Sequence, residues 1–153
     1  MLDNQSTVVG RRVLDLGAGS GLVGIAAVKA GACDVVAAEV DRYALSALKL
    51  NMKLNEASIS VLRGDITNRA PPETDVILVG DLFYSADLSA RVVAFLERCS
   101  IRGIEAPVGD PWRAHLPTSR LAELAHYILT EGGSHAMRTG VFAFMPHPKR
   151  SRQ

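Results

Sequence analysis

Cysteine, net charge and long apolar runs are all scarce in this sequence, and each absence excludes a class of protein. The 153 residues include two cysteines, Cys33 and Cys99, with no C-x-x-C pair and no histidine at metal-binding spacing. Neither a disulfide framework nor a metal site is therefore expected, and both thiols should be reduced and mostly buried. Seventeen basic and sixteen acidic side chains give a net charge of +1, which provides no broad attraction for nucleic acid or a membrane surface.

Segments that direct a chain into or across a membrane are also missing from the pattern. No apolar run reaches the length of a bilayer crossing, and residues 1–5 lack the basic and apolar regions of a signal peptide. We therefore expect a cytoplasmic protein. A chain of this length with 48% hydrophobic residues suits one core, so we expect a single domain over 1–146 and a basic, flexible tail over 147–153.

Apolar runs alternate with segments of helical period along the whole chain, which is typical of βαβ units in a mostly parallel sheet. The expected strands are 11–16, 34–40, 59–63, 75–80, 104–109, 126–131 and 140–145. The expected helices are 22–30, 42–54, 86–99 and 119–125. Gly31 and Gly103 are placed to end two helices. The last two strands lie too close for a crossover helix, which predicts an antiparallel hairpin. The prediction is an α/β fold: a seven-stranded sheet with helices on both faces.

Segment 13–21, Val-Leu-Asp-Leu-Gly-Ala-Gly-Ser-Gly, is the most informative part of the chain because a buried strand turns into a helix there. Glycine permits positive φ and lets a ligand approach the backbone, and the helix start offers free N–H groups. Asp15 is suited to accept hydrogen bonds from cationic or hydroxylic groups and would repel a pyrophosphate. The candidate cofactor-binding residues of this turn are Asp15, Gly17, Ala18, Gly19 and Gly21.

Two cofactor classes compete for this turn. Residues 19–24 also satisfy the dinucleotide pattern G-x-G-x-x-G, whose diphosphate rests on the helix N-terminus. Because Asp15 disfavours a diphosphate, we favour S-adenosylmethionine, a nucleoside with a positive centre, over a nicotinamide or flavin dinucleotide.

Further carboxylates follow the next expected strands, and ligands in such sheets bind beyond the carboxyl ends of the strands. Glu39 is the expected ribose ligand, accepting from both hydroxyls. Asp41 is better interpreted as the cap of the following helix. Asp65 is a candidate for the exocyclic amine of adenine, with a plain turn aspartate as the alternative.

The fourth expected strand ends in Gly-Asp-Leu-Phe-Tyr at 80–84, beside the predicted cofactor site, where a methyl acceptor has to arrive. Asp81 and Tyr84 are the candidate catalytic residues, and Asp81 also borders the cofactor. Phe83 is a candidate for contact with an alkylammonium, although core packing is its simpler interpretation. Asp110, Trp112 and Arg113 follow the fifth strand on the same rim and are candidate substrate-binding residues; Trp112 has core packing as an alternative.

The Asp-x-x-Tyr segment, together with residues 15–21, resembles the seven-β-strand protein lysine methyltransferases. Within that group the sequence is most similar to the electron transfer flavoprotein β-subunit lysine methyltransferase family, on segments 80–84, 109–113 and 141–144. The similarity runs from about residue 2 to residue 146. It implies a Rossmann-like methyltransferase fold and transfer of methyl groups from S-adenosylmethionine to lysines of that flavoprotein subunit. In such a reaction Asp81 would orient the ammonium and Tyr84 would wall the pocket, while water takes the proton.

Three alternatives remain open at this stage. Another N-methyltransferase, acting on a ribosomal protein or a small molecule, would share the cofactor fold because acceptor loops vary more freely. A cofactor-binding module without activity is the second, and a dinucleotide oxidoreductase is the third. The resembled family has an aromatic-rich segment and a helix before its first strand, and only about ten residues precede the strand here. We therefore expect a domain short at its N-terminus, with apolar surface available for self-association.

Overall fold

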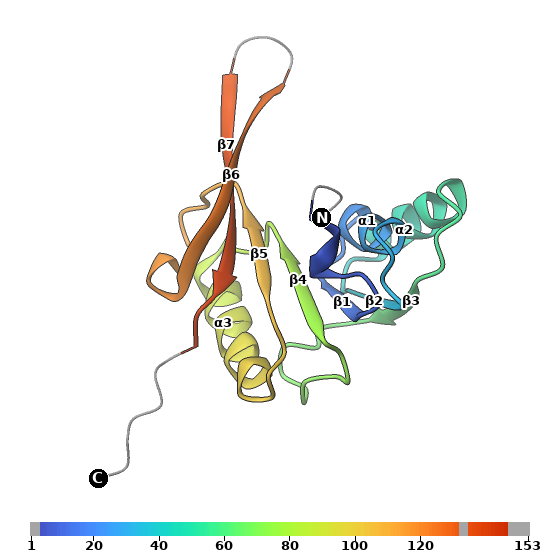
Figure 1. Ribbon diagram of the computed structural model, residues 1–153, viewed down its shortest axis with the longest axis horizontal. Coiled ribbons are helices and arrows are strands. Elements are labelled where there is room, and N and C mark those ends of the chain that lie inside the picture. The colour runs from blue at the N-terminus through green and yellow to red at the C-terminus, as the bar shows by residue number, and fades with distance from the viewer. Residues whose placement is uncertain (1–3, 132–134, 147–153) are drawn as a thin grey trace.

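The chain folds into one seven-stranded sheet with helices on both faces, in a computed structural model that describes residues 4–131 and 135–146 (Figure 1). The predicted tail over 147–153 lies outside the described residues. Strand order is β3-β2-β1-β4-β5-β7-β6. The strands are β1 Arg12–Leu16, β2 Asp34–Glu39, β3 Ser60–Arg63, β4 Val76–Gly80, β5 Pro107–Asp110, β6 Leu121–Glu131 and β7 His135–Phe144.

The first five strands are parallel, and β7 runs antiparallel to both of its neighbours. The chain starts at β1 in the middle of the sheet, moves outward through β2 to β3, and then returns to pair β4 with the other side of β1. The order therefore reverses between β1 and β4, which is where ligands bind in open α/β sheets.

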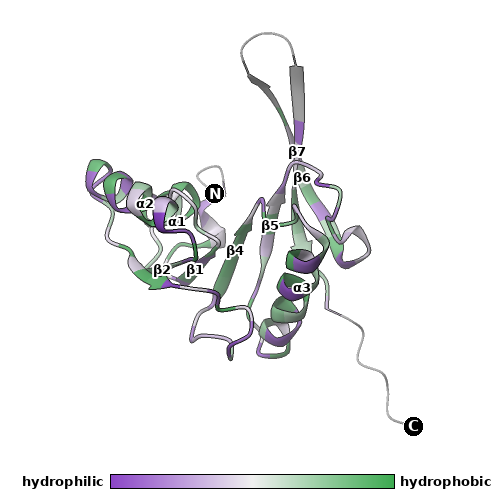
Figure 2. Cartoon of the chain, turned by 180° about the vertical axis from the view of Figure 1, so that it is seen from behind, coloured by the Kyte–Doolittle hydropathy of each residue, from purple (hydrophilic) through white to green (hydrophobic). Residues whose placement is uncertain are grey.

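Three α-helices are present among the described residues: α1 Leu22–Lys29, α2 Arg42–Leu54 and α3 Ala86–Ile101. Alternate side chains of the parallel strands serve two separate cores. Val13 of β1 packs with α1 and α2 on one face, whereas Leu14 packs with α3 on the other. This double burial explains why the central strands read as continuous apolar runs. Figure 2 shows apolar residues in β4 between the two helical layers.

Local signals place the helix ends as predicted. Asp41 accepts hydrogen bonds from the N–H groups of Tyr43 and Ala44, so the capping interpretation of this residue is confirmed. Gly31 and Gly103 each lie just past a helix with positive φ, at 91° and 78°.

The predicted helix over 119–125 is wrong. A short 3-10 turn, Thr118–Arg120, leads directly into β6, which begins at Leu121 and pairs with β7 along its length. The register shifts between Glu123 and Ala125, so Leu124 is an extra residue that breaks the period-2 pattern. Because of this bulge, the apolar residues of the segment recur at helical spacing, which is why the sequence predicted a helix there. The hairpin extends well beyond the end of β5 (Figure 1).

The two cysteines differ in burial, so the expectation that both thiols are mostly buried holds for only one of them. Cys99 is buried in the α3 core, but Cys33 is exposed, and both are free thiols. The same described residues include no group of three or more histidine, cysteine or acidic side chains able to hold a metal ion. Among them no helix has both the length and the apolar character that a membrane crossing needs.

Candidate active site

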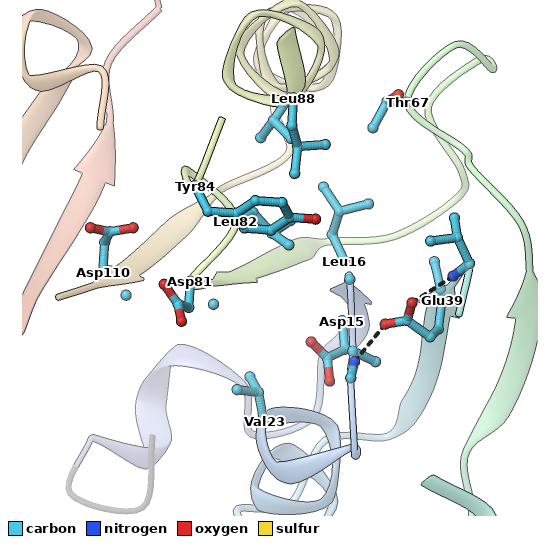
Figure 3. Close-up of a pocket in the computed structure, with 18 of the residues that line it drawn as sticks. Asp15, Leu16, Val23, Glu39, Thr67, Asp81, Leu82, Tyr84, Leu88 and Asp110 are labelled. Atoms are coloured by element: carbon cyan, nitrogen blue, oxygen red, sulfur yellow. Dashed lines mark hydrogen bonds between the residues drawn. The ribbon is translucent and has the colours of Figure 1, made fainter. Parts of the chain in front are cut away.

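A cavity of about 790 Å³ opens at the carboxyl ends of β1, β2, β4 and β5, at the point where strand order reverses. Figure 3 shows its carboxylates spread across it, with Glu39 at one end, Asp15 and Asp81 between, and Asp110 at the other end. The candidate site residues that line the cavity are Asp15, Gly17, Ala18, Gly19, Glu39, Asp65, Asp81, Tyr84 and Asp110. The candidates that are not among its lining residues are Gly21, Phe83, Trp112 and Arg113.

The glycine turn combines an open position with a packed one. The N–H groups of Gly17 and Ala18 donate to the carbonyl of Ala38 at 2.9 and 3.1 Å, which ties the turn to β2. At Gly19, φ is 55° and an added Cβ would meet nothing within 4 Å. At Gly21, φ is 86° and a Cβ would lie 2.2 Å from the buried Leu48 side chain. Gly19 therefore exposes backbone to a ligand, whereas Gly21 is needed to start α1.

Asp15 is buried, with 1% of its surface exposed, and its Oδ2 accepts a hydrogen bond from the N–H of Gly24 at 2.8 Å. Burial raises its pKa to about 6; the Gly24 hydrogen bond opposes that rise and the charge of Glu39 adds to it. The carboxylate thus connects the end of β1 to the first turn of α1. Its contact with a ligand stays a prediction.

Glu39 is held almost entirely by backbone groups. Its Oε2 accepts from the N–H of Gly19 at 2.7 Å, and its Oε1 accepts from the N–H groups of Val40 and Asp41 at 2.7 and 2.8 Å (Figure 3). An ionised carboxylate has about four acceptor positions. With three in use, about one position stays free for a hydroxyl, and the contact of Glu39 with the two ribose hydroxyls stays a prediction.

Asp65 adopts the turn conformation that was its alternative interpretation. Its Oδ1 accepts from both the N–H and the hydroxyl of Thr67, at 2.8 and 2.6 Å. These bonds, and to a lesser degree the neighbouring Arg91 at 3.7 Å, lower its pKa. The adenine contact stays a prediction, with Oδ2 as the oxygen that Thr67 does not use.

Asp81 and Arg113 form a two-point ion pair on the opposite side of the cavity. Nε and Nη2 of Arg113 donate to the two carboxylate oxygens at 2.6 and 2.7 Å, and both side chains are about half exposed. Asp81 has a positive φ of 54°, which is uncommon for a residue with a side chain. The conformation directs a short acidic side chain from the end of β4 toward the loop after β5.

That loop is organised by Asp110, which is completely buried. Its Oδ1 accepts from the N–H of Arg113 at 2.6 Å, and burial is the main reason that its pKa is raised. Trp112 has a φ of 64° and packs edge-on against Phe142, with 5.1 Å between ring centres. The guanidinium of Arg138 lies over the Trp112 ring, 4.9 Å from the ring centre. Trp112 therefore contacts one core ring but is 38% exposed, so it does not fill the core, and its contact with a substrate stays a prediction.

Phe83 and Tyr84 point in opposite directions. Phe83 has no exposed surface and packs in the core beneath α3, so the core-packing interpretation is confirmed and the candidate contact between its ring and an alkylammonium is wrong. Tyr84 lines the cavity and is 62% exposed. Neighbouring residues at a strand end point to opposite faces, so one ring of the pair is buried in the core and the other lies at the site.

Sequence reasoning missed cavity residues that belong to other elements. Arg91 and Leu88 line the cavity from α3, and Thr139 lines it from β7. The spacing of Leu88 and Arg91 places them on one helix face, which is a usable signal. No sequence signal marks Thr139 as a cavity residue, because its position depends on the antiparallel pairing of Asp110 with Gly140.

Comparison with known proteins identifies a family for the N-terminal half of the chain. Residues 1–82 match the family described as ribosomal protein L11 methyltransferase (PrmA). The chain belongs to this family. The cavity of this PrmA family member therefore lies in a methyltransferase fold, and the dinucleotide alternative loses its support.

Relatives of known name extend the match beyond residue 82. Electron transfer flavoprotein beta subunit lysine methyltransferase of Rattus norvegicus is 38% identical over 137 residues, which cover 86% of this chain and 54% of that protein. The chain thus spans about half the length of such relatives. A solved structure of ribosomal protein L11 methylase from Lactobacillus delbrueckii subsp. bulgaricus has a TM-score of 0.69 at 18% identity, covering 95% of this chain and 75% of the other. The Pyrococcus abyssi tRNA (uracil-54, C5)-methyltransferase, solved with S-adenosyl-L-homocysteine, has a TM-score of 0.70 at 15% identity, covering 92% and 36%. Both likenesses confirm the predicted fold.

Proposed function

We propose that this protein is an S-adenosylmethionine-dependent lysine N-methyltransferase and that its substrate is the electron transfer flavoprotein β-subunit. One observation carries the proposal: the match to the lysine methyltransferase relatives covers 86% of the chain, so it includes both the cofactor side and the rim around Asp81. The PrmA family match, in contrast, stops at Leu82.

The residues of the cavity fit S-adenosylmethionine. Gly19 offers backbone with free space above it, Glu39 has acceptor capacity for a ribose hydroxyl, and Leu16, Val40 and Ile66 add apolar surface for a base. Asp15 contributes a carboxylate near the turn, which suits a cationic ligand better than a diphosphate. When bound, this cofactor supplies an electrophilic methyl group on a positively charged sulfur. The structure solved with S-adenosyl-L-homocysteine in the Pyrococcus abyssi enzyme agrees with this choice.

The acceptor side has to hold an amine in line with the transferred methyl group. Asp81 and Tyr84 line the cavity beyond the glycine turn, where a lysine side chain would enter. Asp81 is paired there with Arg113, and the exposed Tyr84 ring forms a wall that reduces access of water. Before transfer the ammonium has to lose one proton to water, because only the neutral amine has the lone pair that would accept the methyl group.

The direct test is transfer of a labelled methyl group to the purified flavoprotein β-subunit. We expect label on lysine with the wild-type chain, and a loss of at least tenfold for Asp81→Asn. Asp34→Asn is the matched control, because Asp34 is an exposed aspartate at the start of β2. Absence of lysine label with the wild-type chain would remove the substrate assignment.

Ribosomal protein L11 is the second candidate substrate, because the family match over residues 1–82 carries that name. It belongs in the same assay as a parallel acceptor, and preferential labelling of L11 would reverse the assignment. Calorimetry with S-adenosylmethionine distinguishes a binding module from an enzyme, since a module would bind the cofactor without turnover. The cytoplasmic location, the extent of the domain and the self-association expected from the sequence stay predictions.

A further inference from the structure

The deepest carboxylate of the cavity has an oxygen with no partner. Asp110 is 0% exposed, and its Oδ1 accepts from the N–H of Arg113. Its Oδ2 is the one buried side-chain oxygen or nitrogen without a hydrogen bond among the residues that the structure describes. Leaving a buried acceptor unpaired costs about 1–3 kcal/mol, and more for a charged group, so such an atom calls for an explanation.

The neighbouring charges define what is missing. Asp81 at the end of β4 has both oxygens engaged by Arg113, so that pair is neutral by itself. The other nearby cation, Arg138 of β7, lies over Trp112 and donates to Glu123 at 3.1 Å. Asp110 therefore lines the cavity as a carboxylate with one oxygen to which neither Arg113 nor Arg138 donates. Burial is the main cause of the raised pKa of Asp110, and the charges of Asp81 and Arg113 act on that pKa in opposite directions. A cation beside Oδ2 would therefore favour the ionised form.

A ligand that completes this cluster has to be positively charged and rich in donors. A primary ammonium has three N–H donors and no acceptor, and its compact charge suits a single carboxylate oxygen. A guanidinium is a poorer fit, because its planar fork seeks two oxygens and Arg113 already occupies the pair that Asp81 presents. Position agrees with chemistry, since Asp110 lines the same cavity as the glycine turn and lies beyond Asp81 (Figure 3).

We propose that Oδ2 of Asp110 binds the ε-ammonium of the substrate lysine, with the Asp81–Arg113 pair as its neighbour. This inference rests on the proposed function and names the atom that recognises the acceptor. It makes Asp110 a substrate-binding residue and Arg113 a positioning residue, which holds Asp81 and donates its backbone N–H to Asp110.

The only tryptophan of the chain provides a direct readout. Trp112 stands two residues from Asp110, so its fluorescence can report a small cation entering the cluster. The probe is n-butylammonium chloride, titrated in the presence of S-adenosylhomocysteine. We expect a saturable change with the wild-type protein and none with n-butanol, which has the same shape without the charge.

Asp110→Asn is the informative variant, because its amide oxygen can still accept from the N–H of Arg113 while an amide NH₂ replaces Oδ2. We expect at least a tenfold weaker affinity for n-butylammonium and a KM for the lysine acceptor raised at least tenfold, with a smaller change in kcat. Affinity for S-adenosylmethionine and the unfolding midpoint should stay near those of the wild type. Arg113→Gln should bind n-butylammonium at least as tightly, because Asp81 then adds a second free carboxylate.

Wild-type affinity of Asp110→Asn for n-butylammonium, or an equal response to n-butanol, would overturn the inference. Because the titration needs no methyl transfer, it is independent of the substrate assignment. Asp110-dependent binding without lysine label on the flavoprotein would reject the proposed function alone. Lysine labelling with an unchanged KM in Asp110→Asn would reject the role of Asp110 alone.

Discussion

The two sides of the cavity hold their carboxylates in different ways. On the cofactor side, Asp15 and Glu39 accept from backbone N–H groups and are nearly inaccessible to water. On the acceptor side, Asp81 is half exposed and is held by the long side chain of Arg113. Backbone donors in a packed turn have little freedom to lose, whereas a side-chain ion pair can be rearranged at small cost. The cofactor side is therefore rigid, whereas the Asp81–Arg113 pair of the acceptor side is suited to adapt to a protein surface.

The range of the family match agrees with this difference. Residues 1–82 carry the PrmA family match and include the backbone-held turn and Glu39; on the acceptor side they include Asp81 but end before Tyr84, Asp110 and Arg113. A site held by backbone is shared by proteins with different substrates, because it serves the cofactor that they have in common. The following changes separate the two sides, from the largest expected effect to the smallest.

The strongest perturbation removes the core support under the acceptor side. Phe83→Ala deletes a fully buried ring and should lower the free energy of unfolding by about 3–5 kcal/mol. Tyr84→Ala is the matched control, because this adjacent ring is 62% exposed and its loss should cost less than about 1 kcal/mol. Urea unfolding measures both. Similar losses for the two variants would contradict the division between core and site.

Asp15 should make the cofactor side less stable as the pH rises. Its pKa is about 6 in the folded chain and near the usual 3.8 when unfolded, so between these values the folded state binds more protons. The stabilising contribution of the protonated form is fully present below about pH 4 and is lost as the pH rises through about 6. Asp15→Asn should remove this loss, which amounts to about 3 kcal/mol.

Unfolding of wild type and Asp15→Asn at pH 4 and pH 7.5 checks this prediction. Relative to wild type, Asp15→Asn should be more stable at pH 7.5 than at pH 4. Asp34→Asn should show no comparable change with pH. The same Asp15 variant should bind S-adenosylmethionine more weakly, because it lacks the negative charge beside the turn. A difference that is constant with pH would mean that Asp15 ionises as easily in the folded chain as in the unfolded chain.

Two glycines with the same geometry separate binding from stability. Gly19 and Gly10 have φ of 55° and 70°, and an added Cβ meets nothing within 4 Å at either position. Because alanine is strained at positive φ, the substitution should lower the free energy of unfolding by about 1 kcal/mol at either position. Only Gly19 lines the cavity, so Gly19→Ala should lose about tenfold in cofactor affinity by calorimetry, while Gly10→Ala should keep it. Equal affinities would place the cofactor away from the turn.

The smallest effect is expected on the acceptor side itself. Arg113→Gln breaks an ion pair whose two side chains are about half exposed, so the free energy of unfolding should fall by less than about 1 kcal/mol. The difference from wild type should shrink when the salt concentration rises from about 0.1 M to about 1 M. A larger loss that salt does not reduce would show that the acceptor side is as rigid as the cofactor side.

Much of the fold could be predicted from the sequence, because strand and helix periods are local signals. The helix over 42–54 and the cap at Asp41 are as expected, and the strands of the parallel core differ from expectation by a few residues at their ends. The error over 119–125 has a local cause as well. The bulge at Leu124 disturbs the alternation, and only the pairing with β7 makes that segment a strand.

By itself, the sequence determined the glycine turn, the strand that ends just before Asp81 and the presence of carboxylates at the strand ends, since these depend on neighbouring residues. Tertiary structure decided what each carboxylate does. Arg113 reaches Asp81 across 32 positions of the chain, and Glu39 reaches the turn across 20. Whether a carboxylate is neutralised, bound to backbone or left with a free oxygen depends on groups brought together by folding, and no local pattern encodes those distances.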